Sequence, residues 1–264
     1  MLGSGFYNPA ALDCCMNLLK AASTVSLLTL ASRVTGLIRE QLIAATFGAS
    51  AATDAFNVAF RIPNLLRRLF AEGAFSQAFV PILAASREKE GDEATHRLVD
   101  AVATVLVWAL LATCALGVIA APVLVYLLAS GLERFDAAVV MTRLMFPYIG
   151  FMSLVALSAG ILNTWKRFAV PAVTPVLLNL AVIVAAWLGV PWFQSLGVQP
   201  IYALAVGVMV GGVLQLAVQV PALARLSLLP RIGLTPSAIA AAWHHPGVRR
   251  VLKLMAPAAF GVSI

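Results

Sequence analysis

Residues 101–129 read AVATVLVWALLATCALGVIAAPVLVYLLA, and this stretch decides the fold class of the chain. It contains no charged side chain, and its apolar residues cover every face of a helix instead of alternating as in a membrane-spanning strand. Because a helix rises about 1.5 Å per residue, roughly 20 such residues cross a hydrocarbon core about 30 Å thick. The stretch therefore predicts a transmembrane helix.

The whole chain has the composition of a multi-pass membrane protein. Hydrophobic residues make up 61% of the chain and charged residues 11%, and the mean hydropathy is +0.95, which excludes a water-soluble globular protein. Six complete apolar runs and the start of a seventh predict an all-α bundle of transmembrane helices. These runs are residues 18–47, 55–85, 98–129, 139–163, 170–190, 201–226, and 248 onward.

The apolar runs divide the chain into three parts. Residues 1–15 are expected to be an amino-terminal extension, and residues 16–226 to form a lobe of six transmembrane helices. Residues 227–264 are expected to form a cytoplasmic loop and the start of a seventh helix. The last run has no closing polar flank, so we expect the protein to continue beyond Ile264.

The basic residues predict the orientation of the bundle. Short loops on the cytoplasmic side of a membrane protein carry an excess of Lys and Arg. The loops on one side contain only Arg134 and, just inside its helix, Arg143, whereas those on the amino-terminal side contain Lys20, Arg87, Lys89, Arg97, Lys166, Arg167, Arg225, Arg231, Arg249, Arg250 and Lys253. The amino terminus is therefore predicted to be cytoplasmic. This topology accounts for the net charge of +7 without a nucleic-acid partner.

Charged residues inside the first two runs predict a water-filled cavity. An arginine at the centre of a bilayer costs about 2.5–3.5 kcal/mol on insertion scales, so several of them need a polar environment. Arg33 and Glu40 are seven residues apart and share a stripe of the first helix, and Arg39 lies about 120° round from Arg33. The second run carries a longer stripe at helical spacing, with Arg67 beside it: Asp54, Asn57, Arg61, Asn64, Arg68 and Glu72.

The excess of arginine in these two helices predicts an anionic ligand. Arginine remains charged in almost any environment, and its planar pairs of donors match phosphate oxygens. A site for organic cations would instead need more carboxylates than Glu40, Asp54 and Glu72 supply. No phosphate-binding glycine loop, nucleophile elbow or zinc motif is present, so we expect neither a metal nor another bound cofactor.

Several stretches closely resemble the MurJ (MviN) family of lipid II flippases. The longest is residues 52–81, ATDAFNVAFRIPNLLRRLFAEGAFSQAFVP. The resemblance continues in four shorter motifs and covers residues 16–264. These motifs are SRVTGLIR at 32–39, ILNTWKRF at 161–168, VGGVLQL at 210–216 and APAAFGVS at 256–263.

The resemblance implies the two-lobe fold of the multidrug/oligosaccharidyl-lipid/polysaccharide exporters, of which this chain would be the amino-terminal lobe. It implies a flippase, not an enzyme, in the bacterial inner membrane, driven by the membrane potential, with lipid II, membrane lipid and the peptidoglycan-synthesis machinery as partners. Arg33, Arg39 and Arg67 match positions at which the family binds the diphosphate and sugar headgroup, and Asp54 matches a functional acidic position. A secondary set in the cavity comprises Asn64, Arg68, Glu72 and Glu40.

Three other functions remain open from the residues. The same cavity would suit a flippase for another polyprenyl-diphosphate-linked oligosaccharide. A membrane-embedded phosphosugar transferase would need catalytic carboxylates at the membrane surface, but the acidic residues there form a mixed-charge loop typical of a solvated surface: Glu88, Glu90, Asp92 and Glu93. A membrane scaffold without transport activity would tolerate substitution of the arginines.

Overall fold

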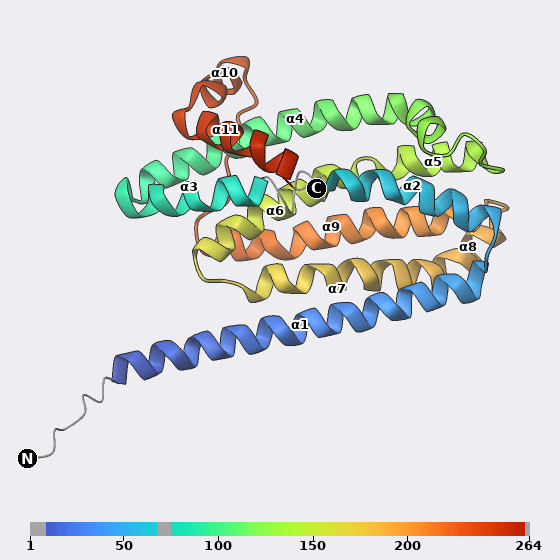
Figure 1. Cartoon of the computed structure of the whole chain (residues 1–264), viewed down its shortest axis with the longest axis horizontal. Helices are drawn as coiled ribbons and strands as arrows, with labels where there is room; N and C mark the ends of the chain where they lie inside the picture. Colours follow the sequence, from blue (N-terminus) through green and yellow to red (C-terminus); the bar gives the residue numbers. More distant parts are fainter. Residues whose placement is uncertain (1–8, 68–74, 262–264) are drawn as a thin grey trace, which may run out of the picture.

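The computed structural model describes residues 9–67 and 75–261, and every regular element in these ranges is helical (Figure 1). This confirms the predicted all-α class. In chain order the elements are α1 (Pro9–Phe47), α2 (Ala51–Arg67), α3 (Phe75–Lys89), α4 (Gly91–Leu128), α5 (Phe135–Met145), α6 (Tyr148–Thr164), α7 (Ala169–Val184), a π-helical segment (Ala185–Gly189), α8 (Val190–Ser195), α9 (Tyr202–Arg225), α10 (Pro236–His244) and α11 (Pro246–Gly261).

Four segments of the described chain are long and apolar enough to cross a membrane. They are Gly91–Leu128, Phe135–Thr164, Ala169–Ser195 and Tyr202–Arg225, and they correspond to four of the six predicted spans. The first predicted span lies within the 39 residues of α1. The second, 55–85, falls on α2 and α3, and residues 68–74 between them lie outside the described chain. The chain is a multi-pass membrane protein, and the number of complete spans stays a prediction.

Several predicted boundaries differ from those observed. Helix α1 already includes residues 9–15, so the helix continues through the predicted boundary of the extension. The predicted mixed-charge loop is instead the end of α3 and the start of α4, joined by a tight turn in which Gly91 has a φ of +83°. Helix α8 extends the fifth span to Ser195, and α11 begins at Pro246 instead of 248. Apolar patterning places a span well but not the polar turns of helix that extend it.

The fourth predicted span is broken at Pro147. Because proline has no backbone N–H, it interrupts the helical ladder, and the chain makes a tight turn in which the Ile149 N–H donates to the Phe146 carbonyl over 3.1 Å. The Phe146 ring fills the space beside Gly117 of α4, where an added Cβ would lie 1.8 Å from a ring carbon. Because Phe146 lies at the break, its ring packs α4 closely against the helix pair α5 and α6 at this point.

Two buried apolar clusters hold the helices together. One, which includes Met141, Met145 and Leu204, joins α2, α4, α5, α6 and α9. The other, which includes Phe79 and Ile161, joins α3, α4, α6, α10 and α11. Helix α1 packs chiefly against α7 at the border of the bundle (Figure 1). Its other faces expose large apolar side chains: Leu27, Leu30, Val34, Leu37 and Ile38.

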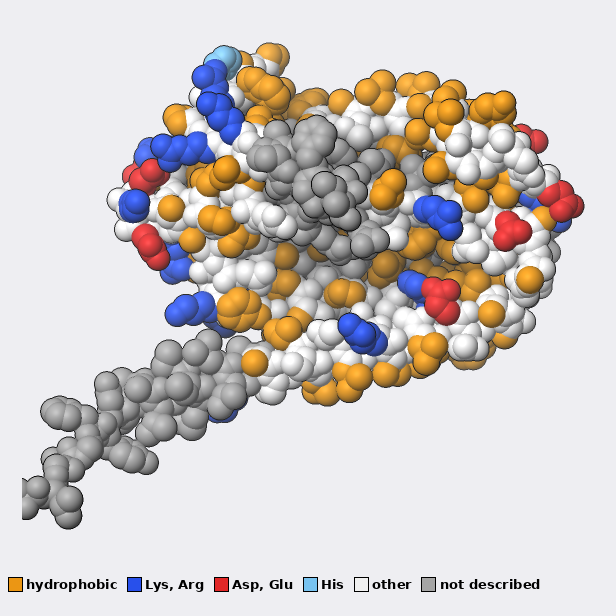
Figure 2. Space-filling view, in the orientation of Figure 1, with side chains coloured by type: hydrophobic (Ala, Val, Ile, Leu, Met, Phe, Trp, Pro, Cys, Tyr) orange, Lys and Arg blue, Asp and Glu red, His pale blue; other side chains and the backbone are white. Residues whose placement is uncertain are grey.

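Charged side chains are concentrated at the two ends of the bundle (Figure 2). Lys and Arg gather at the end where α3 turns into α4 and where α10 lies, whereas the end near α5 and α8 carries several acidic groups (Figure 2). At the basic end, Arg87 of α3 donates to the Thr164 carbonyl over 3.0 Å and lies 4.4 Å from the centre of the Trp165 ring. The few charges between the two ends lie over α1 and α2, where the sequence predicts a cavity (Figure 2).

Candidate functional site: a polar cavity with an arginine

Asn179 of α7 holds α1 against the bundle. Its Nδ2 donates to the Ser32 carbonyl over 2.9 Å and to Thr35 Oγ1 over 3.2 Å, and its Oδ1 accepts from Arg39 Nη1 over 3.0 Å. The three partners are three, four and seven residues apart, so they share one face of α1. Asn179 is 6% exposed, and both its donors are satisfied within the protein. The contact fixes which face of α1 meets α7.

Arg39 has N–H groups that its contacts with other described residues do not use. Its Nη1 bonds to Asn179, and its Nη2 forms an ion pair with Glu40. A guanidinium has five N–H groups, so three of those of Arg39 have no partner among the described residues. The side chain of Arg39 is 20% exposed and that of Glu40 is 63% exposed. A charged fork that is mostly buried and incompletely bonded is suited to bind an anion.

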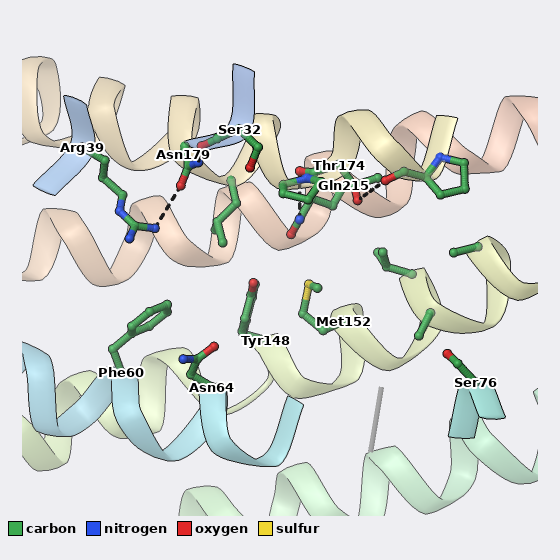
Figure 3. A pocket seen from close by; sticks show the side chains of 16 residues that line it. Ser32, Arg39, Phe60, Asn64, Ser76, Tyr148, Met152, Thr174, Asn179 and Gln215 are labelled. Carbon is green, nitrogen blue, oxygen red and sulfur yellow. Dashed lines mark hydrogen bonds between the residues drawn. The ribbon is translucent and has the colours of Figure 1, made fainter. Parts of the chain in front are cut away.

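Arg39 lies at the border of a cavity of about 590 Å³. Figure 3 shows Arg39, Asn179, Thr174 and Gln215 along one wall, and Phe60, Asn64, Tyr148 and Met152 on the facing wall. The first wall comes from α1, α7 and α9, and the facing wall from α2, α3 and α6. Among the described residues that line the cavity, Arg39 is the only charged one. The described lining consists of Ser32, Arg39, Phe60, Asn64, Ser76, Tyr148, Met152, Val155, Ala156, Ala159, Pro171, Thr174, Pro175, Leu178, Asn179 and Gln215.

A second cavity of about 330 Å³ begins on the other side of Arg39. Arg39 and Phe60 line both cavities, and the second is also lined by Glu40, Thr53 and Asn57. The guanidinium therefore lies at the border between the two cavities. An anion moving from one cavity to the other along α1 would remain within reach of the same arginine.

The polar stripe predicted on α2 is confirmed for its described part. Asp54, Asn57 and Arg61 are exposed, and Asn64 is half-buried in the first cavity. The opposite face of α2 is buried in the core through Ala55, Phe56 and Ala59. The side chain of Arg67, together with Arg68 and Glu72, lies outside the described residues.

Arg33 lies apart from the cavities. It is exposed on α1 and lines neither of the two cavities. The structure thus brings Arg39, Glu40 and Asn64 together with these cavities, and Arg33 and Asp54 lie on exposed helix faces nearby. The sequence predicts that Arg33 and Arg39 both face the cavity, but of the two only Arg39 lines it, and a role of Arg33 in ligand binding stays a prediction.

The amides of the cavity wall are not among the residues predicted from the sequence. Asn179 and Gln215 are both buried and line the cavity, and neither was singled out. A signal was present, because each is an amide within an otherwise apolar span. A buried amide needs hydrogen-bond partners, so it indicates a helix contact or a ligand-binding wall.

The described residues that line the cavity supply groups suited to binding a ligand. The described residues contain no cluster of three or more His, Cys, Asp or Glu side chains that would hold a metal ion. Of the acidic residues near the basic end, Glu90 accepts from Ser86 over 3.0 Å, and the exposed Glu93 accepts from Arg97 over 3.0 Å. The site therefore combines one cationic fork with amides, hydroxyls and apolar walls, which suits a large ligand with an anionic group and polar substituents.

Comparison with known proteins identifies the family. The family model "Lipid II flippase MurJ" matches residues 43–264. The lipid II flippase MurJ of Burkholderia cenocepacia is 56% identical over 253 residues, which cover 94% of this chain and 48% of that protein. The probable lipid II flippase MurJ of Vibrio cholerae is 39% identical over 260 residues, which cover 94% of this chain and 47% of that protein.

A solved structure of a lipid II flippase MurJ in an inward closed conformation has the same fold. It matches with a TM-score of 0.72 and 27% sequence identity, covering 90% of this chain and 47% of that chain. The present chain spans about half the length of the curated relatives that it matches. It therefore belongs to the MurJ family of lipid II flippases, which are transporters and not enzymes.

Proposed function

We propose that the protein moves lipid II, the undecaprenyl-diphosphate-linked peptidoglycan precursor, from the cytoplasmic to the periplasmic leaflet by alternating access. This activity is that of a protein of the relatives' length, to which this chain contributes the amino-terminal lobe. The observation that carries the proposal is Arg39, a mostly buried guanidinium with three N–H groups that have no partner among the described residues, at the border of two cavities. Membership of the family supports the choice of ligand.

The arginines have the charge and geometry that the diphosphate requires. Arg39 binds the phosphate oxygens in the cavity, while Arg33 and Arg67 attract the headgroup at the edge of the site and Asp54 contributes an acidic group beside it. Asn64, Glu40, Arg68 and Glu72 form the secondary set around them. The polyprenyl tail remains in the lipid, because the exposed faces of the helices are apolar.

The proposal includes an energy source, an orientation and partners. The membrane potential drives the cycle, since moving one charge across the membrane is worth about 2.3 kcal/mol per 100 mV. The basic end of the bundle faces the cytoplasm of a bacterial inner membrane, in accord with the positive-inside rule. The peptidoglycan-synthesis machinery supplies and consumes the substrate.

A bacterium depleted of its own lipid II flippase tests the proposed function. The full-length gene, whose product has the relatives' length and includes this chain, is expressed in that strain as the native form, as Arg39→Ala and as Arg97→Ala. Arg97 is a matched control because its side chain is 66% exposed and pairs only with Glu93 among the described residues. We expect growth with the native gene and with Arg97→Ala, and failure with a well-expressed Arg39→Ala variant. Growth with Arg39→Ala, or no rescue by the native gene, would overturn the proposal.

The choice among lipid-linked substrates needs a second assay. The purified protein is reconstituted in vesicles that contain either lipid II or another polyprenyl-diphosphate-linked oligosaccharide, and exposure of each headgroup on the opposite leaflet is followed with time. Transport of lipid II alone, or at least tenfold faster, is the expected result. Equal rates would assign the protein a wider range of diphosphate-linked oligosaccharides.

A further inference from the structure

Gln215 of α9 is a buried amide in the wall of the cavity that Arg39 also lines. Its side chain is 1% exposed and lines the same cavity as Arg39. Its Nε2 donates to the Thr174 carbonyl of α7 over 2.9 Å. Its Oε1 is buried and has no hydrogen-bond partner among the described residues. In Figure 3 this amide lies on the wall that also carries Asn179 and Arg39.

The orientation of the Gln215 amide is fixed by its partner. A backbone carbonyl only accepts hydrogen bonds, so the nitrogen of the amide must face Thr174. With the amide turned the other way, two acceptors would meet. The group left in the cavity is therefore the oxygen, which accepts a donor and repels an anion. Buried acceptors in native proteins almost always have a partner, so this oxygen indicates a donor that the described residues do not supply.

Donors on the same wall are already used. Pro175 has no N–H with which to satisfy the Pro171 carbonyl, and the Thr174 hydroxyl donates to that carbonyl over 2.8 Å. Both donors of the Asn179 amide are bonded to α1. Neither side chain is thus free to donate to Gln215 Oε1, and no other described residue donates to it.

Arg39 and Gln215 Oε1 suit opposite kinds of ligand group, because the guanidinium donates hydrogen bonds and the amide oxygen accepts them. Arg39 bonds to Asn179 and Gln215 bonds to Thr174, and these two residues of α7 are five apart, or about 7.5 Å along the helix axis. One end of the wall thus favours an anion, and the other favours an O–H or N–H group. A ligand that carries phosphates next to sugar hydroxyls and amides can satisfy both ends at once, in one orientation.

We propose that Gln215 Oε1 forms a subsite for a hydroxyl or amide donor in the sugar-peptide part of the ligand, and so sets the direction of the headgroup relative to Arg39. The inference rests on the proposed function, because it concerns the same cavity and the same lipid-linked ligand. It adds a group that distinguishes a glycosylated diphosphate from a bare one.

Gln219 supplies a matched control on the same helix. It lies one turn further along α9, is fully buried, and lines none of the described cavities. Both polar atoms of its amide have no partner among the described residues. Replacing either glutamine by methionine removes a buried amide of similar size from α9, but only Gln215 faces the ligand.

Binding of two probes to the purified protein in lipid nanodiscs tests the subsite. The probes are lipid II and undecaprenyl diphosphate, which has the same diphosphate and tail but no sugar. We expect Gln215→Met to weaken binding of lipid II about tenfold, the usual effect of one lost hydrogen bond to a buried group, and to leave binding of undecaprenyl diphosphate unchanged. Gln219→Met should change neither affinity, and Arg39→Met should weaken both.

Each outcome separates the subsite from the proposed function. Unchanged binding of the bare diphosphate shows that Gln215→Met is folded, so a selective loss of lipid II affinity supports the subsite. Equal losses for both probes, or no loss for lipid II, would overturn the subsite while the effect of Arg39→Met still supports the flippase. A native protein that binds neither probe would overturn the proposed function and the subsite with it.

Discussion

Arg39 Nη1 donates to Asn179 Oδ1 over 3.0 Å, and the two residues are 140 positions apart in the chain. Asn179 also binds Ser32 and Thr35, so one buried amide positions both the backbone of α1 and the guanidinium that α1 carries. The docking of the helix and the placement of the binding group are therefore coupled. A change that loosens one should loosen the other.

Replacement of Asn179 by leucine tests this coupling. Three hydrogen bonds are lost, and at an average of about 0.6 kcal/mol for each such bond between membrane helices we expect a loss of about 2 kcal/mol in the free energy of unfolding. We also expect a severalfold weaker affinity for inorganic pyrophosphate, because Arg39 is no longer held. Thermal unfolding and calorimetric titration measure the two effects. Asn163→Leu, at an exposed position of α6, should change neither the stability nor the affinity for pyrophosphate. An Asn179→Leu protein with native stability and native affinity would show that α1 docks without this amide.

Removal of the Glu40 carboxylate should strengthen anion binding. Glu40 pairs with Arg39 Nη2 and therefore competes with an anionic ligand for the same donors. Because the Glu40 side chain is 63% exposed, the effect is modest, and we expect Glu40→Gln to raise the affinity for pyrophosphate about two- to fivefold. The gain should shrink as salt is added, since screening weakens the contribution of the charge. A loss of affinity would instead show that Glu40 takes part in binding.

The sequence predicted the parts of the fold that depend on a repeated local pattern. Apolar runs located four spans, and helical spacing located the stripe of α2, because each depends on residues that are neighbours along one helix. The sequence could not show that Asn179 meets Arg39, because that contact joins two helices whose rotation is set by packing. Gln215 was missed for the same reason, because its hydrogen bond to the Thr174 carbonyl joins α9 to α7 and leaves its oxygen without a partner among the described residues.

Close packing of α7 and α9 depends on glycine. A Cβ on Gly211 would lie 2.7 Å from Leu178 Cδ1 and 3.1 Å from Leu178 Cα, and the backbone atom cannot turn aside. We expect Gly211→Leu to destabilise the protein by about 3 kcal/mol through overpacking, measured by thermal unfolding in detergent. Gly131→Ala is the control, because nothing lies within 4 Å of the added Cβ. Similar stabilities for the two variants would contradict the observed helix contact.

A stripe on α4 fastens the segment that leads from α9 to α10. Asp100 Oδ1 accepts from the Arg231 N–H over 2.7 Å, Thr104 Oγ1 accepts from the Gly233 N–H over 3.0 Å, and Trp108 Nε1 donates to the Gly233 carbonyl over 3.0 Å. The three side chains are four residues apart, so they lie on one face of α4. The segment is thus held at successive turns of one helix.

Loss of the Asp100 carboxylate should open the first of these contacts. A hydrogen bond to a carboxylate is stronger than one between neutral groups, so we expect Asp100→Ala to speed amide exchange at Arg231 about tenfold, measured by hydrogen–deuterium exchange. Exchange at Gly233 should rise less, because Thr104 still holds it. Asp92→Ala, an exposed residue in the first turn of the same helix, should leave both amides protected. If the Arg231 amide of Asp100→Ala exchanges as slowly as in the native protein, the segment is held by its packing on α4 and not by this hydrogen bond. The positions of α10 and α11 would then not depend on Asp100.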